Sequence, residues 1–303
     1  MTTNRREQNM IDVAILTYEK LLNPDPHSFY VSQALYEESL MLDYFKRNGI
    51  KAERIDWADR SVDWSRIGCA VFRSTWDYQD RLDQFEAWLE HVKNKTRLVN
   101  SYDVIKWNLD KRYLSELDAA GIKTVPTLFI ERQTQSSMDR LFAHFEADEL
   151  VIKPAVSAGG IDTYRVSKSE ANEFEYKFQE LLSAKTMMAQ PFQHSILDQG
   201  ELSLIVINGQ FTHAARKVVK AGEFRVQDDY GGYTLPHAAN DEEKNFAEKV
   251  VKACPKQLYY ARVDVVYNDR NALSVMEVEL FEPDLFFRFD RSAAEKFAKA
   301  ILS

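Results

Sequence analysis

The feature that most constrains this chain is a pair of apolar runs near its end, separated by a short polar turn. The runs span residues 261–267 and 272–280 and are rich in β-branched side chains, while the turn, residues 268–271, is mostly Asn and Asp. This pattern predicts a hairpin of two adjacent antiparallel strands. The chain must therefore fold around a sheet whose two faces receive alternate side chains.

Alternation gathers three carboxylates on one face of the predicted hairpin. Glu277 and Glu279 share this face, and Asp264, in the middle of the first run, can point to the same side. The other face of the second run receives Met276, Val278 and Leu280. Carboxylates packed in a low-dielectric environment need a cation, and Mg²⁺ binds oxygen ligands of this kind. The pattern predicts a metal site, with an ordinary acidic, solvent-facing strand edge as the alternative.

Length and composition place the hairpin in a protein of two or three lobes. The chain has 303 residues, of which 45% are hydrophobic and 28% are charged, as in an ordinary globular protein. Its net charge of -8 argues against broad nucleic-acid binding, and no apolar run approaches membrane-spanning length. The N-terminus lacks the apolar core of a signal peptide and only two cysteines occur, so we expect a cytoplasmic location.

The first hundred residues alternate strand and helix patterns. Strands are expected over residues 12–17, 51–57, 69–72 and 97–100, and helices over 31–48 and 85–92. This order predicts a parallel sheet that binds ligands at the carboxyl ends of its strands. The stretch at one such end is a candidate for substrate binding and consists of Arg73, Ser74, Thr75, Trp76 and Asp77. A loop held by an Arg73–Asp77 ion pair is the alternative.

The middle of the chain combines a lysine in an apolar strand with a pair of glycines. Lys153 lies in the expected strand 150–154 and needs an anionic partner if it is buried. Gly159 and Gly160 follow, and their backbone N–H groups can bind phosphate, although a simple turn is the alternative. A helix is expected from Asn108, as its cap, to Gly121. Further strands are expected over 124–130, 187–192, 201–208 and 210–218, and further helices over 136–145, 241–253 and 292–302.

These motifs together resemble those of the ATP-grasp carboxylate–amine ligases, such as D-alanine–D-alanine ligase and glutathione synthetase. The resemblance covers residues 108–290 and implies a mixed α/β and α+β fold, with an N-terminal parallel-sheet lobe before a two-lobed ATP-grasp fold. It implies an N-terminal substrate-side domain over 1–106, a central subdomain over 107–188 and a C-terminal subdomain over 189–303. A closer likeness is to the O-ureido-serine cyclo-ligases of the cycloserine pathway, in which residues 73–78, 107–114 and 153–160 recur.

The resemblance also implies a role for each motif. The nucleotide-binding set is Lys111, Lys153, Gly159, Gly160, Gln190, Pro191, Phe192 and Glu201. Lys217 and Arg225 resemble the catalytic cations near the phosphates. The metal ligands would be Asp264, Glu277 and Glu279, which hold two Mg²⁺ ions, with Mn²⁺ as a substitute. Many relatives carry Asn at the last of these positions, so Glu279 adds a negative charge.

The implied function is ligation of a carboxylate to an amine or similar nucleophile through an acylphosphate, with release of ADP and phosphate. The expected partners are ATP and a small amino-acid-like substrate, without nucleic acid or membrane, in a monomer or homodimer. The two reacting groups belong to two molecules or to one. A non-catalytic ATP-binding regulatory module and a phosphotransferase are the alternatives. No residue stands out as the general base for the amine.

Overall fold

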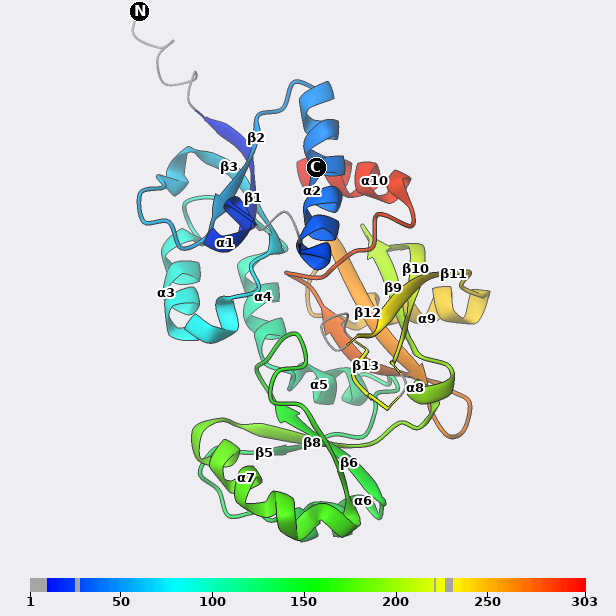
Figure 1. The fold of residues 1–303 in the computed structure, drawn as a ribbon. Coiled ribbons are helices and arrows are strands. Elements are labelled where there is room, and N and C mark those ends of the chain that lie inside the picture. The colour runs from blue at the N-terminus through cyan, green and yellow to red at the C-terminus, as the bar shows by residue number, and fades with distance from the viewer. Residues whose placement is uncertain (1–9, 25–27, 221, 227–230) are drawn as a thin grey trace, which may run out of the picture.

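One parallel and two antiparallel sheets organise the computed structural model of the chain (Figure 1). It describes residues 10–24, 28–220, 222–226 and 231–303. The N-terminal residues on which the signal-peptide prediction rests lie outside these ranges. None of the helices within the described ranges is long and apolar enough to cross a membrane.

The N-terminal sheet is parallel, with the strand order β2-β1-β3-β4. Its strands are β1 (Ile11–Thr17), β2 (Ala52–Asp56), β3 (Ile67–Ser74) and β4 (Arg97–Val99). The helices that follow or connect them are α1 (Glu19–Leu22), α2 (Phe29–Arg47) and α3 (Leu82–Val92). One face packs against α2 and the C-terminal helix α10 (Arg291–Leu302), and the other against α3. Burial on both faces explains why the two inner strands, β1 and β3, are largely apolar, whereas the edge strand β2 carries charged residues.

The central sheet is antiparallel, with the order β5-β8-β6-β7. Its strands are β5 (Leu128–Ile130), β6 (Glu149–Pro154), β7 (Tyr164–Ser167) and β8 (Met187–Pro191). Helices α6 (Met138–Phe145) and α7 (Ala171–Ala184) pack on one face. The sequence pattern gave no expectation for α7. The expected strand 124–130 is shorter than predicted because Pro126 has no N–H to donate to a ladder.

Two helices, rather than one, connect the N-terminal and central sheets. They are α4 (Tyr102–Leu109) and α5 (Tyr113–Ala119), and the chain breaks its helical path at Asp110. The predicted cap at Asn108 is therefore wrong, because Asn108 lies inside α4. Its side chain donates to the Val278 carbonyl at 2.7 Å and accepts from the Leu280 N–H at 2.8 Å. Asn108 thus fixes α4 to the strand that carries two of the three predicted metal ligands, Glu277 and Glu279.

The C-terminal sheet is antiparallel, with the order β11-β10-β9-β12-β13. Its strands are β9 (Glu201–Ile207), β10 (Gln210–Val218), β11 (Tyr233–His237), β12 (Tyr260–Tyr267) and β13 (Leu273–Glu279). The short helix α8 (Ser195–Asp198) precedes them, and α9 (Asp241–Ala253) packs on one face of the sheet. The predicted hairpins, and with them the mixed α/β and α+β fold class, are confirmed.

A β-bulge in the β12–β13 hairpin changes the predicted alternation. Asp264 pairs with Glu277, but the next residue, Val265, pairs with Val275, so Met276 is an extra residue on β13. Val275 consequently enters the core, whereas Met276 packs against the apolar side chains that border the cavity described below. The prediction that Met276 shares a face with Val278 and Leu280 is therefore wrong, because those two side chains pack in the core with Val275.

Candidate active site

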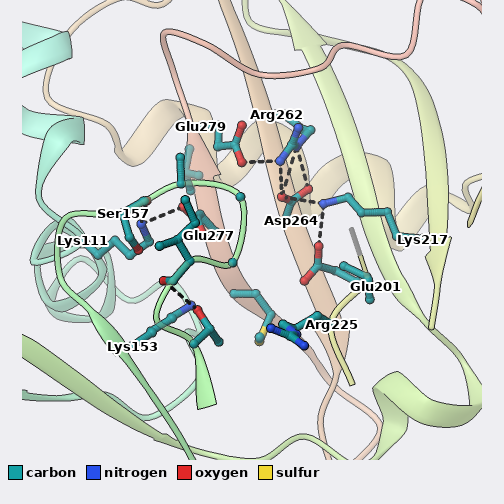
Figure 2. Close-up of a pocket in the computed structure, with 18 of the residues that line it drawn as sticks. Lys111, Lys153, Ser157, Glu201, Lys217, Arg225, Arg262, Asp264, Glu277 and Glu279 are labelled. Atoms are coloured by element: carbon teal, nitrogen blue, oxygen red, sulfur yellow. Dashed lines mark hydrogen bonds and ion pairs between the residues drawn. The ribbon is translucent and has the colours of Figure 1, made fainter. Parts of the chain in front are cut away.

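A cavity of about 490 Å³ lies where the three sheets approach one another. Strands β6, β8, β9, β10, β12 and β13 line it, together with loops that follow β3, β6 and β13. Figure 2 shows how side chains from these segments converge on it. The lining includes every residue predicted to bind nucleotide or metal or to act in catalysis, which are Lys111, Lys153, Gly159, Gly160, Gln190, Pro191, Phe192, Glu201, Lys217, Arg225, Asp264, Glu277 and Glu279.

Adjacent strands of the C-terminal sheet build a buried chain of ion pairs in the cavity (Figure 2). The Lys217 ammonium contacts Glu201 at 2.6 Å and Asp264 at 3.0 Å. The Arg262 guanidinium contacts Asp264 at 2.9 Å and also pairs with Glu279. Burial disfavours ionisation of Asp264, but Arg262 and Lys217 outweigh it and hold the pKa of Asp264 at about 2. Asp264 is therefore ionised at any physiological pH.

A second cationic group faces the bulged strand from the central part of the chain. The Lys111 ammonium contacts Glu277 at 3.1 Å and donates to the Ser157 carbonyl at 2.6 Å. Lys153 is buried on β6, and burial lowers the pKa of its ammonium although Glu277 acts in the opposite direction. Despite its own burial, Glu277 has a lowered pKa because Lys111 and Lys153 stabilise its charge. The two lysines thus bring positive charge to the face of β13.

Two carboxylates of the cavity are left with too little positive charge. Burial raises the pKa of Glu279 to about 8, although Arg262 opposes the shift. Burial likewise raises the pKa of Glu282 to about 7 against the same arginine. A divalent cation beside Glu279 would relieve that carboxylate, and Glu279, Asp264 and Glu277 offer the hard oxygen ligands that suit Mg²⁺. The chemistry of the donor set therefore fits this metal.

The three predicted metal ligands share the cavity but are not arranged around a common point. Within the described ranges, no group of three His, Cys, Asp or Glu side chains forms a ready-made metal site. Arg262 forms ion pairs with Asp264 and Glu279, and Lys111 forms one with Glu277. All three carboxylates are therefore already paired with cationic side chains of the protein. The assignment of these three residues as metal ligands stays a prediction.

The stretch from Gln190 to Phe192 supplies an apolar wall of the cavity. Phe192 clusters with Val226 and Met276, and the Arg165 guanidinium lies 3.9 Å from the centroid of the Phe192 ring. The Phe192 N–H donates to the Glu149 carbonyl at 3.0 Å, and Pro191 has no N–H. This wall can accept a flat aromatic ring such as adenine.

The glycine loop adopts a backbone that demands glycine and reaches the N-terminal lobe. Gly159 and Gly160 have φ values of 61° and 72°, in the left-handed region. The preceding Ala158 N–H donates to the Gln79 side-chain oxygen at 2.6 Å. The loop therefore covers the cavity from the central lobe to the segment that follows β3.

The five residues predicted to bind substrate do not all lie at the cavity. Trp76 lines the cavity, whereas Arg73, Ser74, Thr75 and Asp77 do not. Asp77 pairs with Arg81 and accepts from the Trp57 indole at 2.8 Å, so the alternative Arg73–Asp77 ion pair is wrong.

Arg73 is buried and faces a second, much smaller cavity. It donates to the Pro283 carbonyl at 2.9 Å and lies 3.9 Å from Glu37. Trp76 and Asp284 line both cavities, so they stand between Arg73 and the larger one.

Several residues that line the cavity were not predicted from the sequence to belong to the site. Arg262 could have been found, because it lies two residues before Asp264 on the same strand and so shares its face. Met276 reaches the cavity only through the bulge, which has no simple sequence signal. Glu282 and Gln79 lie beyond strand ends, where alternation no longer predicts direction.

Comparisons with known proteins show the family to which the chain is related. Residues 13–100 match the family model described as D-cycloserine synthetase DcsG, N-terminal domain. Residues 120–287 match that of prokaryotic glutathione synthetase, ATP-grasp domain. The cycloserine biosynthesis protein DcsG of Streptomyces lavendulae is 31% identical over 277 residues, covering 88% of this chain and 93% of that protein.

Solved structures share the whole architecture. The crystal structure of D-cycloserine synthetase DcsG aligns with a TM-score of 0.82 and 30% identity, over 95% of this chain and 98% of that one. D-alanine–D-alanine ligase from Bacillus anthracis complexed with ATP aligns with a TM-score of 0.65 and 15% identity, over 96% of each chain, which is a likeness of fold. The cavity, the family models and the curated relative lead to one conclusion: this chain belongs to the ATP-grasp ligases, which form carbon–nitrogen bonds with ATP.

Proposed function

We propose that this ATP-grasp ligase activates the carboxylate of a small amino-acid-like molecule as an acylphosphate and joins it to an amine or similar nucleophile. In the first step a carboxylate oxygen attacks the γ-phosphorus and ADP leaves. In the second step the nucleophile attacks the carbonyl carbon, phosphate leaves and the nucleophile loses a proton. The likeness to DcsG proteins favours a ring closure, in which both reacting groups belong to one molecule.

The cavity supports this proposal because cations from separate segments meet carboxylates on adjacent strands within one cavity. Lys111 and Lys153 would bind the β- and γ-phosphates, and the apolar wall at Phe192 would hold the adenine. Glu201 would accept the ribose hydroxyls. Phosphoryl transfer needs positioning and charge neutralisation rather than covalent catalysis, which such a set provides.

Mg²⁺ would be held by Asp264, Glu277 and Glu279, and two ions fit the carboxylate count. When bound, the metal neutralises phosphate charge and orients the transferred group. Lys217, which now pairs with Asp264, would then be released to contact the phosphates. Arg225, whose guanidinium pairs with Glu223 at 2.8 Å, would join it as a second cation.

Water must be kept from an acylphosphate because it hydrolyses readily. The glycine loop, held through Ala158 to Gln79 of the N-terminal lobe, covers the cavity and would serve this purpose. The division of the chain at residues 106/107 and 188/189 is part of the proposal. In it, the N-terminal domain contributes to substrate binding and the other two subdomains enclose ATP.

The decisive experiment is ADP release with Mg²⁺ across a panel of amino acids, amines and O-ureido-serine. A ligase requires the carboxylic acid and the nucleophile together, and hydroxylamine should trap the acylphosphate as a hydroxamate. ADP release with an acid alone, together with a stable phosphorylated product, would assign a phosphotransferase instead. ATP binding without turnover on any substrate would assign a regulatory module.

A further inference from the structure

One buried carboxylate of the cavity is not used by the proposed nucleotide and metal sites. Glu282 lies three residues beyond the end of β13, is 7% exposed and lines the cavity. The cations that influence its pKa, Arg262 and Lys111, form their ion pairs with other carboxylates. Within the described part of the chain, Glu282 forms no ion pair. A buried carboxylate without a counter-charge is costly, so a ligand that supplies one gains affinity.

The surroundings of Glu282 are aromatic and come from the N-terminal lobe. The Tyr78 hydroxyl acts on the Glu282 carboxylate as a hydrogen-bond donor. The Trp76 indole N–H donates to the Glu282 main-chain carbonyl at 3.1 Å. The rings of Trp76 and Tyr78 both line the cavity. Aromatic faces beside a carboxylate form a site suited to an organic ammonium group.

The same surroundings are unsuited to a metal ion. Tyr78 and Trp76 present hydrogen-bond donors and carbon rings to this region, not the several oxygen ligands that Mg²⁺ requires. The carboxylates predicted to bind Mg²⁺ lie on the strands themselves and hold protein cations, whereas Glu282 holds none. Glu282 is therefore distinct from the proposed metal ligands in both position and partners.

We infer that Glu282 binds the ammonium group of the substrate, which makes the ligase specific for an amino acid over the matching hydroxy acid. This inference rests on the proposed function, because it places the substrate in the ATP-binding cavity. The ammonium would pair with the Glu282 carboxylate between the rings of Trp76 and Tyr78. A lost charged hydrogen bond of this kind lowers affinity about 10- to 100-fold.

Binding can be measured without turnover by calorimetry in Mg²⁺ and a non-hydrolysable ATP analogue. The probes are O-ureido-serine and both enantiomers of serine and alanine, each of the latter compared with its hydroxy acid, glycerate or lactate. We expect wild-type protein to prefer an amino acid over its hydroxy acid by at least about tenfold, and Glu282→Gln to lose that preference. A wild-type protein without this preference, or a Glu282→Gln variant that keeps it, would overturn the inference.

Three controls separate this role from folding and from metal binding. Glu282→Gln removes a buried charge, so its melting temperature should not fall below that of Glu173→Gln, an exposed change on α7. Tyr78→Phe should weaken amino-acid binding less than Glu282→Gln does. If Glu282→Gln instead changes the Mg²⁺ concentration needed for nucleotide binding, the residue belongs to the metal site and the inference fails.

The inference and the proposed function fail in different ways. If the wild-type preference for an amino acid depends on Glu282 but no ligation occurs, the ammonium site stands and the proposed function is wrong. If ligation occurs equally well with wild type and Glu282→Gln, and both keep the same preference, the ligase stands and Glu282 has no role in recognition.

Discussion

Removing Arg262 tests the electrostatic core of the proposed site. Arg262 is 8% exposed and bridges Asp264 and Glu279 through its guanidinium, and it also donates to the Asp284 carbonyl at 3.2 Å. Arg262→Met keeps much of the apolar side chain but leaves the buried Asp264 and the partly buried Glu279 without this cation. Breaking a buried ion pair from one side costs about 3–5 kcal/mol.

The structure places the expected loss near the lower end of that range. Asp264 retains Lys217 at 3.0 Å and a hydrogen bond from Ser203 at 2.5 Å. Glu279 can take up a proton, because burial already raises its pKa to about 8. We therefore expect the free energy of unfolding to fall by about 3 kcal/mol, which corresponds to a melting temperature lower by roughly 6–12 °C.

The assay is urea unfolding of the two proteins with and without Mg²⁺ and ADP. Because Mg²⁺ supplies the missing positive charge, ligand addition should stabilise Arg262→Met more than it stabilises wild type. Arg270→Met, an exposed change in the turn of the same hairpin, is the matched control and should behave as wild type. A loss below about 1 kcal/mol in Arg262→Met, without extra stabilisation by Mg²⁺ and ADP, would refute the reasoning.

Further predictions concern individual charges. Glu277→Gln should abolish ADP release while the fold persists, whereas Glu279→Asn should keep measurable activity; wild-type turnover in Glu277→Gln would move the metal site elsewhere. Lys153→Ala should reduce the rise in melting temperature that ATP and Mg²⁺ produce. Burial raises the pKa of Glu37 to about 8 in the folded chain, so the folded state binds the extra proton and wild-type stability falls as pH rises from about 5 to 8. Glu37→Gln should flatten that dependence in urea unfolding.

The parts of the fold that obey a simple period could be predicted from the sequence. The parallel lobe follows from apolar strands that alternate with helical patterns, and the hairpins follow from β-branched runs around polar turns. The carboxylates at 277 and 279 share a side because strand period 2 holds between them. The cation set was predicted through the family resemblance, and the structure brings all of its members into one cavity.

The remaining features depend on contacts that are distant in sequence. Asn108 resembles a helix cap locally, yet its amide pairs with the backbone of β13, about 170 residues later. Met276 turns to the cavity because the ladder with β12 contains a bulge. Glu282 becomes a buried site only when the N-terminal lobe places Trp76 and Tyr78 beside it. Local sequence patterns do not predict contacts between segments that are so far apart in the chain.

Arg73 shows how a motif can matter for substrate binding without lying in the substrate cavity. Its guanidinium donates a hydrogen bond to the Pro283 main-chain carbonyl, and the Trp76 indole N–H donates one to the Glu282 main-chain carbonyl. Both residues therefore fix the position of the segment that carries Glu282. Rings of Phe287 and Phe297 lie 5.7 and 5.6 Å from the guanidinium carbon. The sequence predicts a substrate contact for Arg73, whereas this geometry favours a positioning role.

Arg73→Lys distinguishes these two roles. Lysine cannot match a planar guanidinium that bonds a carbonyl and lies over aromatic rings, so a positioning role predicts lower stability by about 1–3 kcal/mol. The same role predicts weaker amino-acid binding with unchanged ATP affinity, because the Glu282 segment would shift while the phosphate site would not. A direct contact with the substrate carboxylate predicts the opposite split, which is an unchanged melting temperature with kcat/KM lower by roughly 10- to 100-fold. That result would return Arg73 to the substrate site and require the cavity wall at Trp76 to open during binding.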